Sequence, residues 1–390
     1  MERKTIFSIV FVAGLVWFFI AIPTAPLDPR VQASAPGTGP GPSGPQIMSP
    51  ITYQNLTIFP VVSAENADTS GFATLDEALA SGDVLVSEQG NFLGRTRDGR
   101  TPPGFSTGPQ VNQLVLINRG KRAVLLLAGE VVSGGKQDRI IAKDRIVPAG
   151  RTPLPLDVFC VEHGRWTGAS DQFSEANLMV HPSVREEAAI EQDQRQVWAA
   201  VRGEAKSVGS PAGVGGTAAA PRISPEALSA AMAGTGTQSY QKIYRSSPIG
   251  ASVETVADEI SRQFDRATSA LKDEHVMGVV VAFGDEVAWS DIFASAELFS
   301  AYWPKLLRSY VVEAMTRPGV RQTASLEEAH DFLRPMTGHI EEESEPGIYL
   351  WRKHSLGRLS ETELTALAPK PLTLHDLRVL RGEGRGLTLR

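Results

Sequence analysis

Residues 111–166 read VNQLVLINRGKRAVLLLAGEVVSGGKQDRIIAKDRIVPAGRTPLPLDVFCVEHGRW, and this stretch decides the fold of the chain. Short apolar runs such as 114–117 and 123–127 alternate in it with polar turns that contain Gly, Pro or Asn. Apolar runs of about five residues between such turns are typical of strands, and the recurrent Gly and Pro exclude a long helix. The stretch therefore predicts a β-rich, sandwich-like core.

Helical patterns follow this β-rich stretch. Residues 253–271 place apolar side chains on one face of a helix that we expect Ser252 to cap. Residues 296–315 form another helix, which Pro304 should divide or kink. Because strands come first and helices later, without regular βαβ alternation, the chain predicts an α+β fold with helices packed on the β core.

Ser or Thr three residues before Glu is the sequence pattern of a helix capping box. The chain has this pattern at Thr74/Glu77, Ser183/Glu186 and Ser325/Glu328. We expect a helix to begin at each of the three. Residues 53–61 predict a single strand before the first of them.

Composition limits the classes of protein. The chain has 390 residues, enough for two or three ordinary domains, and a net charge of −6, which gives no electrostatic case for binding nucleic acid. Its single cysteine, Cys160, excludes an intrachain disulfide and a Cys-rich zinc site.

The amino terminus has the pattern of an export signal. Arg3 and Lys4 precede an uninterrupted apolar run over residues 5–22, which is long enough to span a bilayer. Residues 1–33 are therefore either a cleaved signal peptide or a retained membrane anchor. With positive charge at the amino end, the rest of the chain should lie outside the cytoplasm, in the periplasm or beyond the inner membrane of a bacterium.

Composition also divides the chain into segments. Residues 34–50 form a Pro/Gly linker, and residues 203–222 form a flexible insert rich in Gly, Ala, Ser and Pro. Between the linker and the carboxyl-terminal part, residues 51–335 form the main α+β domain. Residues 336–390 form a β-containing extension.

Cys160 and His163, with Glu162 between them, are the candidate catalytic groups. A nearby imidazole can convert a thiol into the nucleophilic thiolate. However, residues three apart in a strand point to opposite faces, and a lone cysteine in an apolar run is commonly a small core residue. The two interpretations stay open at this point.

Two polar segments are candidates for a contact surface, because scaffolds carry sites at strand ends and on loops. One lies around Gly134-Gly135-Lys136-Gln137-Asp138-Arg139 and the other at Glu162-His163-Gly164-Arg165-Trp166. The candidate ligand-binding residues are Glu130, Lys136, Gln137, Arg139, Glu162, His163, Arg165 and Trp166. A solvated turn and a salt-bridged corner are the structural alternatives.

The sequence lacks the motifs of several common enzyme classes. It has no GxSxG elbow, no phosphate loop and no HExxH or other metal-ligand spacing among its histidines. We therefore expect neither a metal nor a cofactor.

Several motifs, in order, resemble the family of ARG and rhodanese-phosphatase-superfamily-associated proteins. These motifs are residues 74–79 (TLDEAL), 126–130 (LLAGE), 135–139 (GKQDR), 147–150 (VPAG), 160–166 (CVEHGRW), 294–299 (ASAELF) and 303–307 (WPKLL). The resemblance covers most of residues 51–315 and implies a domain assignment, with no established activity. The leader, the low-complexity insert and the longer carboxyl tail depart from the family pattern.

The leading hypothesis is an exported, non-catalytic binding or interaction module whose partner is a protein or a small molecule. No complete catalytic constellation can be assembled from the sequence, which favours this class. The alternative is a hydrolase or transferase that uses Cys160 or His163, with Arg139 or Arg165 binding an anion.

Overall fold

The computed structural model describes residues 45–89, 110–163, 170–202, 223–234, 237–245, 248–317 and 322–382. The predicted export segment lies outside these residues. No helix within the described residues is both long and apolar enough to cross a membrane.

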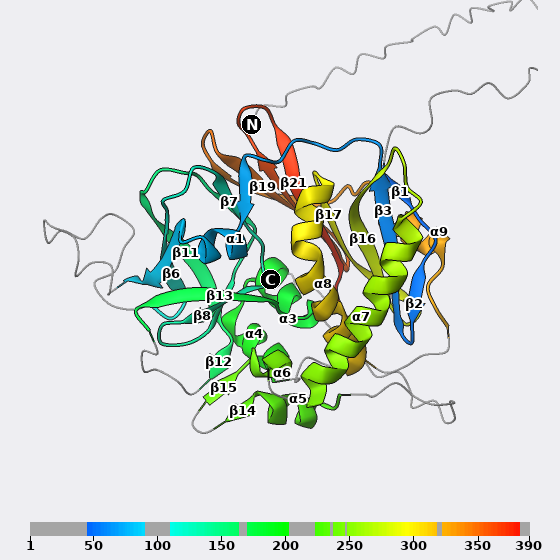
Figure 1. Ribbon diagram of the computed structural model, residues 1–390, viewed down its shortest axis with the longest axis horizontal. Coiled ribbons are helices and arrows are strands. Elements are labelled where there is room, and N and C mark those ends of the chain that lie inside the picture. Colours follow the sequence, from blue (N-terminus) through cyan, green and yellow to red (C-terminus); the bar gives the residue numbers. More distant parts are fainter. Residues whose placement is uncertain are drawn as a thin grey trace, which may run out of the picture. The chain divides into compact units, whose positions relative to one another are not determined.

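A nine-stranded antiparallel sheet is the larger of the two main β structures (Figure 1). Its strand order is β1-β3-β16-β17-β21-β20-β19-β18, and β2 pairs with β3. The strands are β1 (Gln46–Ile47), β2 (Ile51–Tyr53), β3 (Leu56–Ser63), β16 (His275–Phe283), β17 (Glu286–Phe293), β18 (His339–Glu345), β19 (Tyr349–Leu356), β20 (Leu359–Ala366) and β21 (Leu372–Leu380). The predicted carboxyl-terminal extension thus supplies β18 to β21 of this sheet.

Helices cover both faces of the larger sheet. Helix α8 (Ala296–Thr316) contacts β3, β16 and β17, and α7 (Pro248–Thr268) packs on α8 and β2. On the other face, Ala329 and Phe332 of α9 (Leu326–Phe332) pack with Phe59 and Val280 of the sheet. Both faces are therefore apolar and buried near the middle of the sheet.

The second β structure is a closed six-stranded barrel with strand order β11-β6-β5-β13-β8-β9. Its strands are β5 (Val84–Glu88), β6 (Gln113–Asn118), β8 (Glu130–Gly134), β9 (Arg139–Ile141), β11 (Pro153–Cys160) and β13 (Gln172–Met179). The α+β class is confirmed. The β core differs from the sandwich we expected, because β9 pairs with β11 as well as with β8 and so closes the sheet on itself.

Smaller elements surround the barrel. Two three-stranded sheets have the orders β10-β7-β4 and β12-β15-β14. Their strands are β4 (Phe72–Thr74), β7 (Ala123–Leu126), β10 (Arg145–Val147), β12 (Glu162–His163), β14 (Ala233–Gly234) and β15 (Thr237–Ser239). The remaining helices of the described residues are α1 (Leu75–Ala80), α3 (Pro182–Glu186), the π-helix η1 (Glu187–Glu191), α4 (Gln194–Val201), α5 (Pro225–Met232) and α6 (Lys242–Arg245).

The barrel and the larger sheet share one apolar core. Leu125 and Val131 of the barrel side belong to the same buried cluster as Val279 and Trp289 of the sheet. A separate cluster fills the barrel itself and includes Val86, Leu116 and Val132. The inside of the barrel is therefore packed with apolar side chains.

Two of the three predicted capping boxes are confirmed. Thr74 caps α1 and Ser325 caps α9, each with reciprocal bonds to the glutamate three residues later. The prediction at Ser183 is wrong, because Ser183 binds Glu313 of α8 and His181 occupies the N-cap position of α3. The cap at Ser252 is also wrong, because α7 begins at Pro248.

The structure differs from two further predictions about where elements begin and end. Residues 53–61 were expected to form one strand, but β2 and β3 form a hairpin whose turn includes Gln54 at φ +58°. Pro304 does not divide helix α8, which continues from Ala296 to Thr316. Pro304 and Ser300 are exposed, so water can bind the carbonyl that the missing proline N–H leaves free.

Candidate functional site

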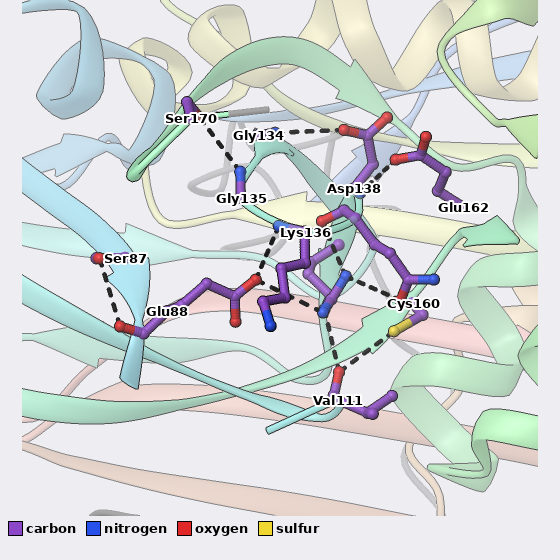
Figure 2. A network of polar contacts seen from close by, with 12 residues as sticks. Ser87, Glu88, Val111, Gly134, Gly135, Lys136, Asp138, Cys160, Glu162 and Ser170 are labelled. Carbon is purple, nitrogen blue, oxygen red and sulfur yellow. Dashed lines mark hydrogen bonds and ion pairs between the residues drawn. The ribbon is translucent and has the colours of Figure 1, made fainter. Parts of the chain in front are cut away.

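Charged side chains gather at one end of the barrel, where β5 ends and β9 begins (Figure 2). Glu88 is the last residue of β5, and Arg139 is the first residue of β9. Their side chains are 3% and 0% exposed. Both lie on strands of the barrel rather than on loops, which fixes their positions closely.

Backbone carbonyls hold the Arg139 guanidinium. Its Nε donates to the Val111 carbonyl at 3.0 Å, and its Nη1 donates to the Gln137 carbonyl at 2.8 Å. Glu88 Oε1 lies 3.9 Å from Nη2, too far for a hydrogen bond. Within the described part of the chain, neither Arg139 Nη2 nor Glu88 Oε2 has a hydrogen-bond partner. Burying such atoms without a partner costs free energy, so a polar ligand that bonded to them would gain affinity.

Two glycines bring the turn between β8 and β9 against Glu88. Gly134 has φ +138° and Gly135 has φ +49°, and the Lys136 N–H donates to Glu88 Oε1 at 3.0 Å. A Cβ on Gly135 would lie 2.3 Å from Phe173 Cζ and 2.8 Å from Glu88 Oε1. Only glycine combines this backbone conformation with so close an approach.

Replacement of Gly135 by Ala is therefore expected to lower the free energy of unfolding by about 2 kcal/mol or more, from the left-handed backbone and the overpacking together. Urea denaturation measures the change. Gly71→Ala is the matched control, because no heavy atom lies within 4 Å of a Cβ built there. Equal stabilities for the two variants would contradict the close approach at Gly135.

The two polar segments that the sequence predicted begin side by side. The Asp138 N–H donates to Glu162 Oε2 at 2.9 Å, and the Val161 N–H donates to the Asp138 carbonyl at 3.2 Å. Asp138 Oδ2 accepts from Ser239 Oγ at 2.7 Å and from Gln241 Nε2 at 2.7 Å. The carboxylates of Asp138 and Glu162 thus fasten the turn to β12 and β15.

Of the predicted ligand-binding residues, Lys136, Gln137, Arg139 and Glu162 come together at this end of the barrel. The side chain of His163 and all of Gly164, Arg165 and Trp166 lie outside the described residues.

Glu130 belongs to a different cluster. It begins β8, four residues and about 13 Å before Gly134 at the other end of that strand. Glu130 Oε1 lies 2.5 Å from Lys305 Nζ, which also pairs with Asp76, while Glu130 Oε2 accepts from the Leu127 N–H at 2.6 Å. Burial raises the pKa of Glu130, although Lys305 opposes this. Glu130 thus joins β8 to α8 and α1, away from Arg139.

Cys160 pairs with Arg139 in the β9–β11 register and is fully buried. Its Sγ donates to the Val111 carbonyl at 3.2 Å. Burial raises the pKa of the Cys160 thiol to about 11, although Arg139 lowers it. The thiol is therefore protonated at neutral pH, unlike the activated cysteine of a nucleophilic enzyme.

A thiol reagent such as iodoacetamide should accordingly label Cys160 at pH 8 about 100-fold more slowly in the folded protein than in urea. Mass spectrometry against time measures both rates. If Cys160 were labelled fast in the folded state, and if His163→Ala abolished that fast labelling, Cys160 would instead be favoured as a nucleophile.

Sequence reasoning missed Glu88, which lies 51 positions before Arg139 in the chain. Its only signal was position, because this glutamate stands two residues before a segment, residues 90–108, that is rich in Gly and Pro. Barrel closure, which that signal does not predict, places it opposite Arg139.

A second charge network lies deep between the barrel and the larger sheet. The carboxylate of Asp291 on β17 accepts from Arg185 Nη1 at 2.7 Å and from Trp289 Nε1 at 2.8 Å, and Tyr310 also donates to it. Burial raises the pKa of Asp291, but Arg185 and the hydrogen-bond donors outweigh burial and hold it well below its usual range. Asp291 is thus a buried, ionised carboxylate.

His375 of β21 extends this network to the barrel. Its Nε2 lies 2.9 Å from Asp291 Oδ1, and its Nδ1 lies 2.5 Å from Asp144 Oδ2 in the segment between β9 and β10. Both ring nitrogens face carboxylate oxygens, so both donate and the ring is an imidazolium. Burial opposes this charge, but Asp144 and Asp291 outweigh burial and raise the pKa of His375 to about 9. The network therefore joins barrel and sheet with paired charges.

Among the residues that the structure describes, no group of His, Cys, Asp and Glu is arranged to hold a metal ion.

The profile of the ARG and Rhodanese-Phosphatase-superfamily-associated Protein domain matches residues 44–373. The chain belongs to this family. The resemblance seen in the sequence is thus confirmed, and the match takes in the barrel, the candidate site and the larger sheet as far as β21. No curated protein and no solved structure matches this family member.

Proposed function

We propose that this family member is a non-catalytic binding module that holds a small ligand at the end of its barrel. The observation that carries the proposal is the pair of Glu88 and Arg139. They are buried, opposite in charge and 3.9 Å apart, and each has one polar atom without a hydrogen-bond partner among the described residues.

The surroundings of the pair also support a binding role. Asp138 and Glu162 hold the turn by hydrogen bonds, and Gln137 accepts from Arg139, so the polar groups are pre-positioned before a ligand arrives. Pre-positioned groups reduce the entropy lost on binding. The protonated thiol of Cys160 gives no support to the alternative of a hydrolase or transferase that uses it as nucleophile.

Affinity selection tests the proposal. The full-length protein is incubated with a library of small metabolites and passed through a size-exclusion column, and the retained compounds are identified by mass spectrometry. We expect a compound that is retained unchanged in mass by the wild type and lost in Arg139→Lys, which keeps the charge but not the planar guanidinium.

Arg195→Lys is the matched control, because the Arg195 side chain is 89% exposed on α4. Glu88→Gln is a second, isosteric variant in case Arg139→Lys does not fold, as judged by circular dichroism. Retention that is equal in the wild type and in the folded site variants, or no retained compound at all, would exclude the proposed site. Release of a compound of altered mass would favour an enzyme.

We also propose that the protein is exported, on the basis of the basic residues Arg3 and Lys4 and the apolar run over residues 5–22. Cell fractionation of the tagged full-length chain should find it in the periplasm or the inner membrane. Deletion of residues 5–22 should leave it in the cytoplasm, and an unchanged distribution would refute the proposal.

A further inference from the structure

The unpaired atoms of the site are one donor and one acceptor. Arg139 Nη2 carries N–H groups that need an acceptor, and the carboxylate oxygen Glu88 Oε2 needs a donor. The two side chains approach to 3.9 Å. A ligand group that offers an acceptor and a donor on the same or on neighbouring atoms would satisfy both at once.

The charges around the site disfavour an anion. Glu88, Asp138 and Glu162 supply three carboxylates, against the two cations Lys136 and Arg139 among the described residues. A phosphate or carboxylate bound to Arg139 Nη2 would lie close to the Glu88 carboxylate, whose Oε1 is 3.9 Å from that nitrogen. Repulsion between like charges is strong where both are removed from water.

Arg185 is an instructive comparison, because its Nη2 also lacks a hydrogen-bond partner within the described chain. There, however, Nη1 contacts the Asp291 carboxylate at 2.7 Å, and the guanidinium lies over the Trp289 ring at 5.5 Å. The Arg185 charge is thus already compensated by direct contacts. Arg139, in contrast, makes only the longer ion pair of 3.9 Å with Glu88, and Glu88 Oε2 has no hydrogen-bond partner within the described chain.

We infer that the ligand is neutral and bonds to the Glu88–Arg139 pair through a carboxamide or a hydroxyl group, an inference that rests on the proposed function. A carboxamide places its carbonyl oxygen toward Arg139 Nη2 and its NH₂ toward Glu88 Oε2. A hydroxyl accepts from the first and donates to the second through a single oxygen. A simple carboxylate has no donor for Glu88, and an ammonium ion has no acceptor for Arg139. Hydrogen phosphate has both a donor and an acceptor, but its negative charge would lie next to the Glu88 carboxylate.

Side-chain NMR of the full-length protein tests the inference. The Nε–Hε resonance of Arg139 is assigned by its loss in Arg139→Lys, and three probes are titrated to about 200 mM, because such small ligands bind weakly. The probes are acetamide, ethylene glycol and inorganic phosphate at constant ionic strength. We expect a saturable shift with acetamide if the site binds a carboxamide, or with ethylene glycol if it binds a hydroxyl group. We expect no saturable shift with phosphate.

Glu88→Gln replaces one acceptor oxygen by an N–H donor and should weaken the neutral probe roughly tenfold or more. Arg195→Lys should leave its affinity unchanged. A saturable shift with phosphate would overturn the ligand class but leave the binding site itself in place. If neither neutral probe gave a saturable shift, the ligand class would also be overturned. The binding role itself is decided separately, by whether the wild type retains a metabolite in the affinity selection.

Discussion

Replacement of Asp291 by Asn is expected to lower the free energy of unfolding by about 3–5 kcal/mol, the cost of breaking a buried ion pair by removing one partner. The substitution would leave the Arg185 guanidinium, 1% exposed, without a carboxylate in the core. Trp289 and Tyr310 both donate hydrogen bonds to the Asp291 carboxylate. In the variant, the N–H groups of the new amide could face these two donors, and donors cannot bond to each other. The variant should therefore unfold at a much lower urea concentration, if it folds at all.

Asp157→Asn is the matched control for this substitution. Asp157 is an exposed residue of β11 that accepts a hydrogen bond from Gln113 at 3.2 Å. Its replacement should change the free energy of unfolding by no more than about 0.5 kcal/mol. Asp291→Asn with a stability close to that of the control would show that the Asp291–Arg185 pair is not buried as described.

The second large effect is a pH dependence that arises from His375. The pKa of His375 is raised to about 9 in the folded protein, against a usual value of 6.5. The imidazolium therefore adds stability that is fully present below about pH 6.5 and is lost as the pH rises through about 9. The difference between the folded and the usual pKa of His375 corresponds to about 3 kcal/mol in the free energy of unfolding.

Urea unfolding of the wild type and of His375→Gln between pH 6 and pH 10 measures this contribution. We expect the variant to be less stable than the wild type by about 3 kcal/mol at pH 6, with the difference largely gone at pH 10. Cys160, whose folded pKa is also raised, adds a pH dependence of its own, but it is common to both proteins and cancels.

His330→Gln, on the exposed face of α9, should follow the wild type at every pH. A difference between wild type and His375→Gln that does not change with pH would mean that His375 is neutral in the folded protein. The role of the Asp144–His375–Asp291 contacts would then be packing alone.

Part of the candidate site could be predicted because its residues are neighbours along the chain or across one strand pair. Lys136, Gln137 and Arg139 share one turn, and pairing of Cys160 with Arg139 brings Glu162 next to that turn. Glu130 was grouped with them by proximity in sequence, but it lies at the opposite end of β8.

The capping-box pattern predicted the start of a helix correctly only where no distant residue binds the capping side chain. The capping boxes at Thr74 and Ser325 form as expected, since their hydrogen bonds stay within four residues. At Ser183 the same pattern does not form a cap, because Glu313, 130 residues away, binds the Ser183 hydroxyl and N–H.

The sequence by itself determined the α+β class, most of the strands between residues 111 and 161 and the membership of the family, because these depend on apolar periodicity, turn residues and motifs within short windows. Only the tertiary structure decided that the strands close into a barrel, that Glu88 meets Arg139, and that Asp144, His375 and Asp291 share one buried network. These contacts join residues from 51 to more than 200 positions apart. Which charges become partners depends on how strands pair and how sheets pack, and no local pattern of residues specifies that.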